Sequence, residues 1–84
     1  MAWDSDAATR LGRVLRERRL AMGLTQQTLS DRAGVTKNQI QLIEAGRAEA
    51  GEDAAPSNPR VATLAKLCGV FELSVADVLA RAEL

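Results

Sequence analysis

The side chains best suited to recognition chemistry lie in residues 23–47. This stretch is typical of two short helices joined by a tight turn at Gly34, a residue that readily adopts the left-handed conformation. At 100° per residue, Ile40 and Ile43 point to one side of the second helix, and a row of amide and basic side chains points to the other. Amide and ammonium groups can pair with the donors and acceptors of base pairs in the major groove. The pattern predicts a helix packed by its back against a core while its front enters that groove.

Local capping signals predict the two helices that would position this face. Thr25 can cap a helix that ends at Ala33. Thr36 can cap the next one, and Gln39, three residues later, completes a capping box. Gly46 then ends this second helix, as glycine commonly does.

An earlier helix is expected from about Thr9 to Met22, after a flexible N-terminal arm of residues 1–8. Arg19 lies on the inward face of that helix, where a charge needs a partner. Glu44 is the best candidate, because it lies on the inward edge of the groove-facing helix. We therefore predict an Arg19–Glu44 ion pair with a structural role.

Two more helices are expected after a long acidic loop at about residues 47–58. The loop lacks apolar periodicity, which predicts an exposed and mobile segment. Ser57 or Asn58 is expected to cap a fourth helix that runs to about Glu72, and Ser74 to cap the last one. The expected inward residues of the fourth helix are Val61, Leu64, Leu67, Cys68 and Phe71.

Composition and charge narrow the class of protein. The chain has 84 residues, 46% of them hydrophobic, with one Trp, one Phe and no Tyr, which predicts a single small all-α domain. The net charge is zero, but residues 10–47 carry eight basic residues against three acids, and residues 48–84 carry three against six. This asymmetry predicts one face for phosphates and another turned away from them.

Enzyme, metal and membrane functions are disfavoured. The chain has no His, and its single Cys68, expected to be a buried thiol, can form neither an internal disulfide nor a usual zinc site. No Ser or Cys has an evident base beside it, and no cofactor or small-molecule ligand is indicated. An apolar run of membrane-spanning length and a signal-peptide pattern are both missing, so we expect a cytoplasmic protein.

In the order of its motifs the chain resembles the helix-turn-helix family of phage repressors and Cro proteins (XRE type), which are small bacterial transcription factors. The resemblance covers roughly residues 11–79 and rests on GLTQQTLSDRAGVTKNQIQLIEAGR, NPRVATLAKLC and LSVADVL. It implies a compact five-helix DNA-binding domain over residues 9–84, with the second and third helices forming the motif. The family's link after the third helix is usually shorter and often basic, whereas this loop carries Glu49, Glu52 and Asp53.

The resemblance also implies where DNA contacts lie on the recognition helix, residues 36–45. Lys37, Asn38 and Leu42 fall where base-contacting residues usually sit, and Gln41 shares their outward face. The alternatives are a solvated first turn for Lys37 and Asn38, a phosphate or solvent for Gln41, and partial burial for Leu42. Contacts with the DNA backbone are expected from Gln26, Thr36, Gln39 and Arg47.

These observations predict a sequence-specific, double-stranded-DNA-binding transcriptional regulator, located on the bacterial nucleoid when bound. Because one helix reads only a few base pairs, a homodimer on a pseudo-palindromic operator is expected. Its expected interface lies around the last helix and includes Val75, Val78, Leu79 and Leu84. The alternative is an antitoxin-type or other protein-interaction module that keeps the fold, favoured by the zero net charge and the acidic segment 48–55.

Overall fold

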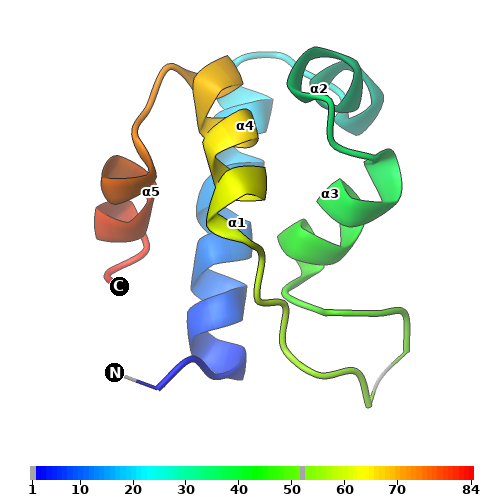
Figure 1. The fold of residues 1–84 in the computed structure, drawn as a ribbon, viewed down its shortest axis with the longest axis vertical. Helices are drawn as coiled ribbons and strands as arrows, with labels where there is room; N and C mark the ends of the chain where they lie inside the picture. Colours follow the sequence, from blue (N-terminus) through cyan, green and yellow to red (C-terminus); the bar gives the residue numbers. More distant parts are fainter. Residues whose placement is uncertain (1, 52) are drawn as a thin grey trace.

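The structure, a computed structural model, describes residues 2–51 and 53–84 of the chain. This part contains five helices joined by loops (Figure 1). In chain order they are α1 (Ser5–Ala21), α2 (Gln26–Ala33), α3 (Lys37–Ala45), α4 (Val61–Phe71) and α5 (Val75–Arg81). α1 contacts α3 and α5, α2 packs on α3 and α4, and α4 packs on α5. The all-α, five-helix class predicted from the sequence is confirmed. No helix among the described residues is long and apolar enough to cross a membrane.

α1 begins at Ser5, so the prediction of a flexible arm over residues 1–8 is wrong for the second half of that segment. The Asp4 carboxylate caps the helix and accepts a hydrogen bond from the Ala7 backbone N–H at 2.9 Å. Ala7 is 1% exposed. A capped first turn with small buried side chains needs no apolar stripe, which is why periodicity missed it. Met1 lies outside the described residues.

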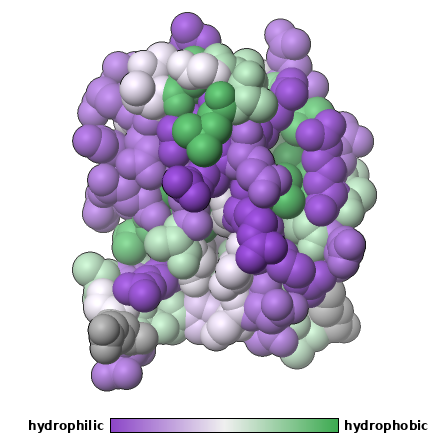
Figure 2. Space-filling view, turned by 180° about the vertical axis from the view of Figure 1, so that it is seen from behind, coloured by the Kyte–Doolittle hydropathy of each residue, from purple (hydrophilic) through white to green (hydrophobic). Residues whose placement is uncertain are grey.

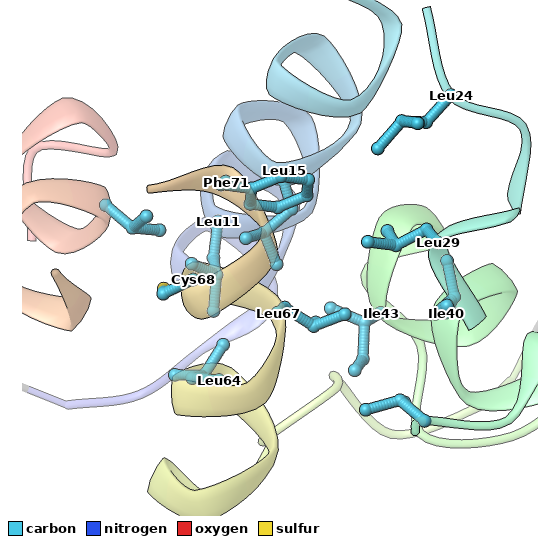
Figure 3. Packing of buried hydrophobic residues seen from close by; sticks show 12 residues of the cluster. Leu11, Leu15, Leu24, Leu29, Ile40, Ile43, Leu64, Leu67, Cys68 and Phe71 are labelled. Carbon is cyan, nitrogen blue, oxygen red and sulfur yellow. The ribbon is translucent and has the colours of Figure 1, made fainter. Parts of the chain in front are cut away.

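All five helices contribute to one hydrophobic core (Figure 3). Its largest fully buried side chains are Leu11, Leu29, Ile40, Leu67, Phe71 and Val78. Val61, predicted to point inward, is instead 71% exposed, because the first turn of α4 extends beyond the core. Val78, predicted in the dimer surface, is 1% exposed and belongs to the core of the single chain.

α1 supports α3 by direct backbone contact. A Cβ atom added at Gly12 would lie against the carbonyl oxygen of Ile43 and 2.8 Å from that of Glu44. Only glycine lets α1 approach the end of α3 this closely. The turn before α3 depends on Gly34, which has the predicted left-handed conformation with φ +69°.

The loop after α3 is tied at its base, which the expectation of a mobile segment did not foresee. Ser57 N–H donates to the Gly46 carbonyl at 3.0 Å, and Ala48 N–H donates to that of Ala55 at 2.8 Å. The Trp3 indole N–H donates to the Ser57 carbonyl at 2.6 Å. The loop is therefore closed by its own backbone and held by the N-terminal segment. Glu52, one of the three acidic residues of the loop, lies outside the described residues.

α4 starts later than predicted. Its N-cap is Arg60, whose side chain makes no capping hydrogen bond, so neither Ser57 nor Asn58 caps it. Ser57 is buried and its backbone groups close the loop, which keeps this segment extended up to the helix. The other end agrees with the sequence to within one residue, since Glu72 is the C-cap, with φ +58°.

The rear surface is mainly hydrophilic, with small separate apolar areas (Figure 2). The large hydrophobic residues with high exposure, among those described, are Leu20 at 53% and Val61. Single exposed side chains of this kind are common on soluble domains. This view shows no broad apolar face.

Candidate nucleic-acid interface

The helix predicted to enter the groove is α3, and its start is capped as predicted. Thr36 Oγ1 accepts a hydrogen bond from the Gln39 backbone N–H at 3.1 Å. In return, Gln39 Oε1 accepts one from the Thr36 N–H at 3.4 Å. Ile40 and Ile43 are 1% and 7% exposed. The back of α3 is thus anchored in the core and its first turn is closed.

The front of α3 carries polar side chains that point away from the domain. Lys37, Asn38 and Gln41 are exposed, and the structure records no side-chain hydrogen bond or ion pair for them among the described residues. Leu42 is half-buried and lines a hollow beside α3. The partial burial left open for Leu42 is therefore present, while the three polar groups are solvated and available for a ligand.

A hollow of about 450 Å³ lies beside α3, between that helix and residues 57–63. Its polar lining comes from Gln39, Arg47, Ser57, Asn58, Arg60 and Thr63. Arg60 is exposed and was not singled out from the sequence. Its signal was its place directly before α4, in a half of the chain that is otherwise acidic.

The four side chains expected to contact the DNA backbone all form hydrogen bonds within the chain. Thr36 and Gln39 form the capping box. Gln26 Nε2 donates to Glu44 Oε1 at 3.2 Å, and Arg47 Nη1 donates to a loop carbonyl at 3.2 Å. A glutamine amide has two N–H donors and a guanidinium has five, so Gln26, Gln39 and Arg47 keep donors for a phosphate.

The structure contains the ion pair that the sequence predicted between α1 and α3. Arg19 Nε and Nη2 donate to the two carboxylate oxygens of Glu44 at 2.7 and 2.9 Å. Arg19 Nη1 also donates to the Leu24 carbonyl at 2.8 Å. The hydrogen bond from Glu44 raises the pKa of Arg19, although burial opposes the charge. A bidentate, buried pair of this kind holds α1, the next loop and α3 in one geometry.

Two basic residues of the first half, Arg10 and Arg18, donate hydrogen bonds to backbone carbonyls of the same chain. Arg18 Nε and Nη2 donate to the Phe71 carbonyl at 3.3 and 3.0 Å, at the end of α4. Arg10 Nη1 donates to the carbonyls of Ala82 and Glu83, just after α5. Cations are favourable at helix C-termini, so these two arginines stabilise the packing of α4 and α5 on α1.

Comparisons with known proteins identify the family. The family model described as a helix-turn-helix domain matches residues 10–79. Two solved structures of the clp gene regulator ClgR from Corynebacterium glutamicum are similar to this chain, both at 30% sequence identity, with TM-scores of 0.71 and 0.70. Each alignment covers 92% of this chain, and they cover 72% and 87% of the solved chains. No curated protein matches the sequence.

The chain belongs to the helix-turn-helix domain family, because the family model matches most of its length. The family match confirms the helix-turn-helix class that the resemblance to phage repressors and Cro proteins implied. α2 and α3, joined at Gly34, form the motif.

Proposed function

We propose that this chain reads a DNA sequence by placing α3 in the major groove and thereby regulates transcription. The observation that carries the proposal is the two-sided α3, with Ile40 and Ile43 buried behind it and solvated polar groups in front. A rigid back with hydrogen-bonding groups in front is what readout of base edges requires. The similar ClgR structures are described as those of a clp gene regulator, which supports transcriptional control as the outcome of binding.

The proposed roles follow from the side-chain chemistry. Asn38 can form paired hydrogen bonds with adenine, Lys37 can reach guanine acceptors, and the exposed part of Leu42 can contact a thymine methyl. Gln41, on the same face, is the fourth base contact. The proposed contacts with the DNA backbone are Gln26, Thr36, Gln39 and Arg47, to which the hollow beside α3 adds Arg60.

Salt dependence of binding to a random-sequence duplex tests the proposal. Each phosphate contact contributes about −0.9 to the slope of log K against log salt. Arg47→Ala, which removes a proposed phosphate contact, should make the slope shallower, whereas Lys66→Ala, an equal change of charge at an exposed site on α4, should leave it unchanged. A wild-type chain that fails to bind at low salt would refute DNA binding. It would favour the protein-interaction alternative, to which the exposed acids Glu49 and Asp53 point.

Sequence readout is tested at a site selected from genomic fragments. Asn38→Ala should cost about 1–3 kcal/mol there and relax the preference at one base position. The same variant should bind random duplex as the wild type does. An equal loss on both kinds of DNA would assign Asn38 to the backbone instead of to a base.

We also propose that the chain acts as a homodimer on a pseudo-palindromic operator. Two recognition helices about one helical turn apart supply the specificity that a single helix lacks. The exposed parts of Val75, Leu79 and Leu84, each half-buried against the core, are the apolar groups available near α5. The mass in solution at high concentration, with and without DNA, tests this. A monomer under both conditions would exclude the dimer and leave DNA binding intact.

A further inference from the structure

Glu44 links the two helices of the motif, because it accepts a hydrogen bond from α2 in addition to its ion pair with Arg19 on α1. Its Oε1 accepts from Gln26 Nε2 at 3.2 Å as well as from Arg19 Nη2 at 2.9 Å. Its Oε2 accepts from Arg19 Nε at 2.7 Å. The Glu44 side chain is only 6% exposed, and Gln26 is the half-buried first residue of α2. One carboxylate on α3 thus fixes a side chain at the start of α2.

This arrangement restricts a side chain that is otherwise flexible. A free glutamine loses rotamer entropy when it is ordered by a ligand, and a glutamine that is already ordered avoids much of that loss. With one N–H of its amide donated to Glu44, Gln26 retains a second N–H on the same nitrogen. It stands at a helix N-terminus, where unpaired backbone N–H groups favour an anion. Because Arg19 neutralises Glu44, the carboxylate adds little repulsion toward a phosphate.

We propose that Glu44 is a positioning residue, which holds the Gln26 amide in the orientation that contacts a DNA phosphate. The same carboxylate is part of α3, so the place of the recognition helix and the phosphate contact at α2 are set together. This inference rests on the proposed DNA contact of Gln26 and adds the group that prepares it.

A comparison of Gln26→Ala in two backgrounds tests the proposal. One background is the wild type, and the other is Arg19→Met/Glu44→Leu, in which apolar side chains replace the buried pair. Replacing a buried ion pair by apolar residues is often neutral for stability, and denaturant unfolding of each variant verifies the fold. The probe is a labelled random-sequence duplex at low salt, followed by fluorescence anisotropy.

In the wild-type background, Gln26→Ala should weaken binding about tenfold, the typical loss for a hydrogen bond to a charged group. In the apolar background the loss should fall to about two- to threefold, because Gln26 is no longer oriented. Gln27→Ala is the matched control, since the neighbouring amide is held by Asp31 Oδ1 at 3.0 Å instead of by Glu44. It should change binding equally in both backgrounds.

Two results would overturn the positioning role: an equal loss for Gln26→Ala in both backgrounds, or no loss in the wild type. A wild-type chain that does not bind the duplex would instead refute the proposed function itself. Hydrogen exchange of the Gln26 side-chain amide, measured by NMR without DNA, gives an independent readout. It should be slow in the wild type and fast in the apolar background, and fast exchange in the wild type would also overturn the proposal.

Discussion

Gly12→Ala should destabilise the domain even though alanine is the better helix former. Gly12 lies within α1, where its missing side chain leaves room for the end of α3. An added Cβ would meet the carbonyl oxygen of Ile43 and lie 2.8 Å from that of Glu44, inside van der Waals contact. Both neighbours are backbone atoms of a helix, so neither can rotate away. The substitution therefore forces α1 and α3 apart.

The size of the effect follows from two opposing contributions. Overpacking a well-packed site costs about 1–3 kcal/mol. The upper part of this range applies, because two rigid backbone groups must move. Replacing Gly by Ala in a helix interior contributes about 1 kcal/mol in the other direction. We therefore expect Gly12→Ala to lower the free energy of unfolding by about 2 kcal/mol.

Gly69→Ala is the matched control for this prediction. Gly69 also lies inside a helix, α4, but a Cβ atom there meets no heavy atom within 4 Å. It should raise the free energy of unfolding by up to about 1 kcal/mol. Urea denaturation of both variants measures the difference. If Gly12→Ala gained stability as Gly69→Ala does, the close approach of α1 and α3 would be wrong.

Two other perturbations test the ends of the chain. Trp3→Phe removes the indole N–H that donates to the carbonyl of buried Ser57, so it should lower the free energy of unfolding by about 1–3 kcal/mol and speed hydrogen exchange at Ala48 and Ser57. Unchanged exchange would mean that the loop closes without Trp3. Hydrogen bonds from the Ser74 backbone and side chain lower the pKa of Asp77, so its stabilising contribution is present near neutral pH and is lost as the pH falls through that lowered pKa. The difference in Tm between wild type and Asp77→Asn should therefore shrink in acid, and a difference independent of pH would contradict this reasoning.

The parts of the fold that the sequence predicted well depend on neighbours three or four residues apart. The capping box at Thr36, the cap at Ser74 and the left-handed turn at Gly34 are all local signals, and each is present. The Arg19–Glu44 pair spans more of the chain, yet it was predictable because both charges lie on faces that the apolar pattern turns inward. Local chemistry and periodicity were sufficient for these features.

The features that sequence reasoning missed depend on contacts between distant residues. The hydrogen bond from Trp3 to Ser57 joins residues 54 positions apart, and no local sequence pattern predicts it. That bond and the loop closure also explain the late start of α4, because the backbone groups of Ser57 form hydrogen bonds that close the loop and do not cap the helix. Local capping preference predicted a start near Ser57 or Asn58, and tertiary contacts overrode it. The proposed roles of the α3 residues remain predictions from position and chemistry.

Charge counted along the sequence overstates the charge that can face DNA. Arg10, Arg18 and Arg19 donate into the fold, whereas Arg47 donates once to a loop carbonyl and keeps its other N–H groups for a phosphate. The exposed basic residues between positions 10 and 47 that have no such bond within the described part of the chain are Arg13, Arg16, Arg32 and Lys37. Since the salt slope grows with the number of neutralised phosphates, random DNA should be bound weakly and with a shallow slope. Selection of an operator by this chain must therefore depend mainly on the geometry of α3, which the core, the buried ion pair and the close approach at Gly12 hold in place.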